Sequence, residues 1–367
     1  MEKNTKECPN CKKKTANNSK SCSSCGLNLD SDENYIRAKE ETNNGNDSFL
    51  SELNKIAGGS GKVELRLRDL VVNVFKKHTP EERENTFICG TAKTSPKEGE
   101  ICSKWPKPWL FSRVFFLFAI TFAGLVALLK IFENILAYPG IIFIGALIIP
   151  FSLLIFFWEV NAPRNINIFD VVKIFFFGGV FSLLITMILS RVVYVRNVDY
   201  IGSIMIGIIE ESAKFIVVAY FLRGSKEKYI LNGLLLGAAV GAGFAVFETA
   251  GYAFAYGFQI PTMMKIIYTR GILAFGGHIV WAAMYGAALV MVKEDNRLKF
   301  KYITNIKFLK YFIIAVALHA VWDMPISNTS NLPIIQGILT IIAWIVILIL
   351  ISTGLKQISS LSYSNRI

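Results

Sequence analysis

From residue 109 onward the sequence consists largely of apolar blocks of about 20 residues, and this feature constrains the fold more than any other. An apolar helix of about 20 residues crosses the hydrocarbon core of a bilayer, where only helices and closed barrels satisfy their backbone hydrogen bonds. The blocks predict about eight membrane-spanning helices, at 109–130, 135–158, 168–190, 199–222, 230–256, 271–292, 308–325 and 333–353. We therefore expect an all-α polytopic membrane protein embedded in the lipid bilayer.

The apolar character is unevenly distributed along the chain. The 367 residues are 53% hydrophobic, yet the first 108 or so are rich in Lys, Asn and Glu. The segment WPKPWLF then marks the membrane interface, with Trp105 and Trp109 as aromatic anchors. We predict a zinc ribbon at 1–30, a flexible polar linker at 31–60, a small cytosolic juxtamembrane region at 61–108, a multi-pass membrane domain at 109–355 and a cytosolic tail at 356–367.

The net charge of +12 does not by itself indicate a nucleic-acid partner. In membrane proteins, excess Lys and Arg gathers in cytoplasmic loops. If the N-terminus is cytoplasmic, the loops on the inner side hold most of the basic residues, and the outer loops hold Lys130, Arg191, Arg196, Lys265 and Arg270. This bias predicts that both termini lie in the cytoplasm.

Four of the six cysteines form two knuckles, CPNC and CSSCG, which contain Cys8, Cys11, Cys22 and Cys25. This spacing can close a tetrahedral thiolate shell around one structural zinc ion. Two disulfides are the alternative, but a cytosolic N-terminus keeps the thiols reduced and favours zinc. Ribbons of this kind bind proteins or nucleic acid. We expect a cytosolic protein partner here, rather than nucleic acid.

The stretch GIIEESAKF places Glu210, Glu211 and Lys214 inside an apolar block. Each ionised side chain at the bilayer centre costs roughly 2.5–3.5 kcal/mol, so charges there usually serve a function. Lys214 follows the two glutamates by four and three residues, which is close enough on a helix to pair with either. We interpret Lys214 as the counter-charge that allows the pair to insert.

Three other blocks also carry polar groups. Glu248 continues a stripe of glycines at four-residue spacing, a spacing that lets another helix approach closely. His278 lies on the next block, and His319 and Asp323 lie one helical turn apart on a further one. Purely structural ion pairs would explain one such pair but not the whole set. The expected depths of these residues predict one polar cavity in the middle-to-outer half of the bilayer.

This set of groups suits the hydrolysis of a peptide bond. A glutamate can remove a proton from water while a histidine polarises the carbonyl group or protonates the leaving amine. Alternatively, Glu248, His278 and His319 could ligate a divalent metal such as zinc, with Glu211 as the base. A proton- or cation-coupled transporter would also use buried Glu, His and Lys. No HExxH, GxSxG or GxGD pattern is present.

The four polar motifs resemble those of PrsW-type membrane proteases, which are related to the CAAX prenyl proteases. EESAK is similar to the EExxK motif, GFAVFE to FxxxE, and LHAVWD to HxxxD, while TRGILAFGGH resembles the third motif. The prenyl proteases have His and Asn where this chain has Glu248 and Asp323, which leaves metal dependence open.

The resemblance implies an intramembrane endopeptidase of the bacterial cell membrane that acts on membrane-anchored proteins such as anti-sigma factors. It implies that Glu210, Glu211 and His319 are catalytic. Glu248, His278 and Asp323 complete the motifs and are the remaining candidate catalytic residues.

Overall fold

The computed structural model describes residues 5–7, 14–16, 67–91, 93–97, 100–193, 195, 197–224, 226–257, 259–328 and 333–364. Two short strands, β1 (Thr5–Glu7) and β2 (Lys14–Ala16), form an antiparallel pair near the N-terminus. The four knuckle cysteines and the linker at 31–60 lie outside the described residues, so the zinc ribbon stays a prediction.

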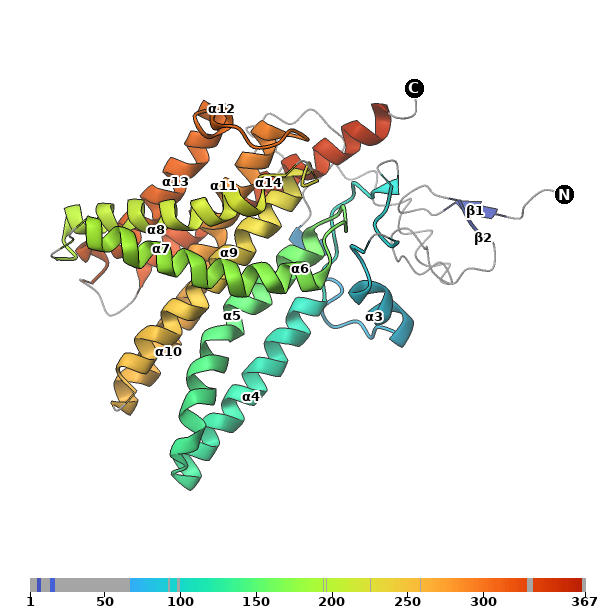
Figure 1. Ribbon diagram of the computed structural model, residues 1–367. Helices are drawn as coiled ribbons and strands as arrows, with labels where there is room; N and C mark the ends of the chain where they lie inside the picture. The colour runs from blue at the N-terminus through green and yellow to red at the C-terminus, as the bar shows by residue number, and fades with distance from the viewer. Residues whose placement is uncertain are drawn as a thin grey trace.

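Helices make up most of the described chain (Figure 1). The juxtamembrane region contains η1 (Leu67–Leu70) and α3 (Pro80–Phe87), and α3 begins with a capping box formed by Thr79 and Glu82. The membrane domain contains α4 (Leu110–Phe132), η3 (Ile135–Ala137), α5 (Tyr138–Val160), α6 (Ile168–Lys173), η4 (Ile174–Gly178), α7 (Gly179–Val192), α8 (Tyr200–Phe221), α9 (Ile230–Ala255), α10 (Ile260–Leu273), η5 (Ala274–Gly276), α11 (His278–Lys293), α12 (Phe300–Ile303), α13 (Ile306–Asp323), η6 (Pro325–Asn328) and α14 (Ile334–Ser364).

Six helical segments of the described chain are long and apolar enough to cross a membrane, rather than the eight that the sequence predicts. They are Leu110–Phe132, Ile135–Val160, Ile168–Val192, Ile230–Ala255, Ile260–Lys293 and Ile334–Leu361. The two other predicted spans are helices in the structure, namely α8 and α13. In each of these two, every stretch of 18 residues contains three charged residues, whereas each of the six has an apolar stretch of 18 residues with two at most.

The segment around residue 271 differs from the prediction. Residues 260–270 were expected to lie in an outer loop, but they form most of α10, which begins with Pro261 in its first turn. Its buried face, which includes Met263 and Ile267, packs with side chains of α4 and α5. A short turn that ends at Gly276 separates α10 from α11, which begins at His278. The span predicted at 271–292 therefore begins in the last residues of α10, crosses the break and continues as α11.

The last helix also extends beyond its predicted end at residue 353, because α14 continues to Ser364. Gln357 supplies a reason for the extension. Its side-chain oxygen accepts a hydrogen bond from the Ile230 backbone N–H at 2.9 Å, and its side-chain nitrogen donates to the Lys228 carbonyl at 3.1 Å. The extra turns of α14 thus satisfy backbone groups at the start of α9, where helices leave N–H groups unpaired.

The central helix of the bundle is α9, whose residues are buried over most of its length. Glycine explains its close contact with α11, as the sequence predicts. A β-carbon at Gly237 would collide with the Ala282 carbonyl and lie 2.9 Å from Ala283 Cα, and one at Gly241 would meet the His278 carbonyl. On another side, Gly243 packs against Gly179 of α7. Figure 1 shows α7 and α8 side by side as they cross the other helices.

Glu159, in the last turn of α5, fixes the start of α4. Its carboxylate accepts hydrogen bonds from the backbone N–H groups of Trp109, Leu110 and Phe111 at 2.7, 2.8 and 2.9 Å. Helix α4 has no side-chain cap of its own, so Glu159 takes the place of one. A carboxylate at this end also interacts favourably with the helix dipole.

The glycine packing leads to a stability prediction within α9. We expect Gly237→Ala to lower the free energy of unfolding by about 1–3 kcal/mol, because the added methyl group overpacks the contact with α11. Gly251→Ala is the matched control, since nothing lies within 4 Å of a β-carbon there. The control should be neutral or stabilising by up to about 1 kcal/mol. Thermal unfolding of the two detergent-purified variants tests this, and equal melting temperatures would contradict it.

Candidate functional site

Helix α8 presents its three charged residues to the interior of the protein. Glu211 and Lys214 are completely buried, and the Glu210 side chain is 13% exposed. The N-terminal end of α8 is capped by Asp199, whose carboxylate accepts from the Gly202 N–H. The Ser203 hydroxyl also lies 3.1 Å from the Asp323 carbonyl oxygen, which ties this end of α8 to the end of α13.

Lys214 is the centre of the polar cluster. Its Nζ lies 2.7 Å from Glu211 Oε1, 3.6 Å from Glu210 Oε2 and 2.8 Å from His278 Nδ1. It also lies 4.2 Å from the centre of the Phe244 ring, a cation–π contact. The prediction that Lys214 pairs with both glutamates is confirmed, and the structure adds a third partner on α11.

His319 is held between three carboxylates. Its Nδ1 lies 2.7 Å from Glu211 Oε1, while its Nε2 lies 3.3 Å from Asp323 Oδ2 and 3.7 Å from Glu210 Oε2. The imidazole ring also stacks on Trp281, with a centroid separation of 4.6 Å. The ring is therefore fixed in orientation, with Nδ1 bonded to Glu211 and Nε2 facing Glu210.

His278 is the first residue of α11, directly after the break from α10, and it links Lys214 to Glu248. Its Nε2 lies 3.0 Å from Glu248 Oε2, and its Nδ1 faces the Lys214 ammonium. Because an ammonium group can only donate, Nδ1 accepts this bond, and the ring proton on Nε2 is donated to Glu248. The two histidine rings lie 5.0 Å apart. All six predicted site residues therefore join one cluster, contributed by α8, α9, α11 and α13.

Arg270 is a member of this cluster that the sequence analysis assigned to a loop. Its guanidinium group pairs with the Glu248 carboxylate, and its Nε donates to the Thr249 hydroxyl at 3.2 Å. The group also lies 4.7 Å from the centre of the Tyr252 ring. The clue that the sequence offered is the segment TRGILAFGGH, which contains both Arg270 and His278.

Two carboxylate oxygens in the cluster make no hydrogen bond with any of the described residues. Glu210 Oε2 and Glu211 Oε2 are buried and accept no hydrogen bond, and the same is true of the hydroxyl of Tyr285, which lies near Glu211. Buried polar atoms without partners are uncommon in native proteins and often mark places where water, an ion or a substrate binds. Glu210 is the more accessible glutamate of the two.

A group of possible metal ligands coincides with this position. One oxygen of Glu210 and one nitrogen each of His278 and His319 lie within 4.8 Å of one another. Two histidines with one carboxylate are a common zinc set, and the Glu211 bond to Nδ1 of His319 is typical of a metal-ligating histidine. The free Glu210 oxygen also fits a metal. His278 can bind a metal only if one of its ring nitrogens gives up its hydrogen bond with Lys214 or Glu248.

This group differs from the ligand set considered from the sequence. The group contains Glu210, whereas the set considered from the sequence contains Glu248. The physical reason is that the Glu248 carboxylate already pairs with Arg270 and His278.

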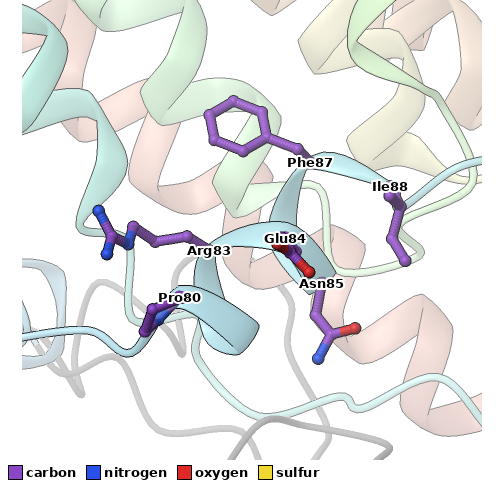
Figure 2. Close-up of a pocket in the computed structure, with 6 residues that line it drawn as sticks. All are labelled: Pro80, Arg83, Glu84, Asn85, Phe87 and Ile88. Carbon is purple, nitrogen blue, oxygen red and sulfur yellow. The ribbon is translucent and has the colours of Figure 1, made fainter.

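A separate hollow of about 500 Å³ lies beside α3, far along the sequence from the cluster. Figure 2 shows its lining residues, which are Pro80, Arg83, Glu84, Asn85, Phe87 and Ile88. None of them belongs to the polar cluster of the membrane helices, so this hollow is not the candidate active site.

Comparison with known proteins identifies the family. Residues 169–351, about half of the chain, match the model of the PrsW family of intramembrane metalloproteases, and this range includes all six predicted site residues. This part of the chain belongs to the PrsW family. The protein is therefore a membrane peptidase, a hydrolase, and the match favours this activity over coupled transport. No curated protein and no solved structure matches the chain.

The contacts of Arg270 in the polar cluster predict a positioning role for this residue. We expect Arg270→Gln to lower kcat for peptide cleavage about 10- to 100-fold, the usual effect of removing a group that orients a site residue. KM and the melting temperature should change little, and Arg270→Lys should recover part of the activity. The measurement is steady-state cleavage of a membrane-anchored reporter in vesicles.

Lys265→Gln is the matched control, because Lys265 is an exposed cation on the same helix. It should cleave like the unmodified protein. An Arg270→Gln variant with an unchanged kcat would show that the ion pair with Glu248 has no part in catalysis.

Proposed function

We propose that the protein is an intramembrane endopeptidase that hydrolyses a peptide bond of a membrane-anchored protein, with Glu210 as the general base. The observation that supports this assignment is the buried Oε2 of Glu210, which makes no hydrogen bond and lies 3.7 Å from His319 Nε2 and 3.6 Å from Lys214 Nζ. The oxygen can accept a proton because no hydrogen bond occupies it. Glu211 also has an oxygen without a hydrogen bond, but its side chain is completely buried and its Oε1 already binds Lys214 and His319.

In the proposed reaction, Glu210 removes a proton from a water molecule as the water oxygen attacks the carbonyl carbon of the peptide bond. The tetrahedral intermediate then collapses, the C–N bond breaks, and the proton passes to the leaving nitrogen. His319 is the group placed to polarise the carbonyl oxygen or to protonate that nitrogen. Glu211 and Asp323 orient His319 through its two ring nitrogens.

The same residues fit a divalent metal, which the family description implies. Glu210, His278 and His319 would hold it, with Glu211 supporting His319, and Glu210 would then be a ligand rather than the general base. When bound, such a metal supplies Lewis acidity to the reaction. The remaining work of binding, orientation and proton transfer belongs to the side chains already described.

Further parts of the proposal rest on the sequence. The cavity opens toward the middle-to-outer half of the bilayer of a bacterial cell, and both termini are cytoplasmic. The two helices with three charges each, α8 and α13, span the membrane with the other six. Anti-sigma-factor-like proteins are the proposed substrate class. The N-terminal knuckles, with Cys8, Cys11, Cys22 and Cys25, hold a structural zinc and bind a cytosolic partner.

The two adjacent glutamates should respond differently to the loss of charge. Glu210→Gln should abolish cleavage and leave the melting temperature nearly unchanged, because its Oε2 makes no hydrogen bond in the structure. Glu211→Gln should lower both cleavage and stability, since it leaves the Lys214 ammonium in a broken buried pair, a change that costs about 3–5 kcal/mol. Cleavage of a single-pass reporter and thermal unfolding of each variant are the two measurements.

Full cleavage by Glu210→Gln would refute Glu210 as the base. Loss of stability in both variants to the same extent would show that the two carboxylates share the structural role. Membrane extraction of each variant in normal amounts provides the control for insertion.

Metal content can be tested separately from activity. We expect the purified protein to hold about two zinc equivalents, and a variant with all four knuckle cysteines replaced by serine to hold about one. Adding His319→Ala to that variant should remove the remaining metal. His78→Ala is the matched control and should leave it bound. Elemental analysis is the measurement, and a metal-free four-serine variant would exclude a tightly bound intramembrane metal.

A further inference from the structure

The juxtamembrane segment 67–79 exposes large apolar side chains next to basic ones. Phe75 is 86% exposed, Val71 is 56% exposed and Val72 is 43% exposed, whereas Val74 between them is buried. Lys76 and Lys77 follow directly and are exposed. The segment thus has one face against the protein and an opposite face that is apolar at one end and cationic at the other. The surface of a soluble protein rarely exposes a phenylalanine to this extent next to two further exposed apolar residues.

Side-chain contacts tie this segment to the start of α4. The His78 ring stacks on Trp109 at a centroid separation of 3.9 Å, and Trp109 immediately precedes α4. Arg113, in the first turn of α4, donates a hydrogen bond to the Lys76 carbonyl at 3.1 Å. Lys107 also pairs with Asp69 at 3.8 Å. Segment 67–79 is therefore held beside the start of α4, a helix long and apolar enough to cross a membrane.

We propose that segment 67–79 is an interfacial anchor that binds the anionic phospholipid surface around the start of α4. Phe75, Val71 and Val72 insert among the headgroups, and Lys76 and Lys77 contact the phosphate groups. Aromatic and aliphatic side chains next to lysines are the composition that the interface favours, and anionic lipids attract lysines close to the surface. The fixed distance to α4 favours lipid over a protein partner, because the bilayer surrounds α4 at this depth.

The anchor can be tested in the full-length protein, reconstituted in vesicles of phosphatidylcholine alone or with phosphatidylglycerol. A photoreactive benzoylphenylalanine replaces Phe75, and mass spectrometry identifies what it links to on irradiation. We expect a phospholipid adduct whose yield is several-fold higher with phosphatidylglycerol, since each lysine near an anionic surface favours contact by about fivefold.

Two charge variants isolate the role of the lysines. Lys76→Gln combined with Lys77→Gln should abolish the preference for phosphatidylglycerol. Lys93→Gln combined with Lys97→Gln removes two exposed lysines from the same juxtamembrane region and should leave the preference intact. Cleavage of a reporter is not part of the readout, so the result does not depend on the proposed function.

Several outcomes would overturn the proposal. Position 75 could link to another part of this chain or to a second copy, which would assign the surface to protein packing. It could remain unlinked, as a water-exposed residue would. Equal adduct yields in the two kinds of vesicle would refute recognition of anionic lipid.

Discussion

The buried ammonium of Lys214 is the interaction on which the polar cluster depends. It lies fully inside the protein and contacts Glu211 of its own helix and His278 of α11. A lone carboxylate or ammonium is costly to remove from water, and the cost is offset when opposite charges meet with good geometry. Lys214 therefore lets α8 carry two glutamates into an apolar bundle. It also determines which nitrogen of His278 faces Glu248.

The helical framework brings the cluster together through close backbone contacts. Glycines on α9 allow α11 to approach, and Gly241 lies directly against the His278 carbonyl. The break at Gly276 allows α11 to begin at His278, so this side chain sits at a helix end rather than within a continuous span. Because packing fixes both helices, the contact between Glu248 and His278 is made by two side chains on helices rather than on loops.

The sequence predicted the members of the polar cluster better than their arrangement. The six residues Glu210, Glu211, Glu248, His278, His319 and Asp323 could be named from charge in apolar blocks, because an intramembrane charge has few structural explanations. The place of Arg270 could not, since a basic residue near a span end is ordinarily a loop charge. The same limit applies to α10. Hydropathy does not show that a Pro-initiated, partly polar segment packs against α4 and α5.

The sequence by itself determined that the chain is a helical membrane protein and which polar residues lie within its apolar blocks. Both follow from the free energy of placing groups in lipid, which depends on residue type and can be read locally. Only the tertiary structure decided which contacts each of those residues makes. Glu211 is completely buried and binds Lys214 and His319 at 2.7 Å, whereas Glu210 is partly exposed and contacts the same two groups at 3.6 and 3.7 Å. The two glutamates are neighbours of identical chemistry, and what distinguishes them is their contacts with helices distant in sequence.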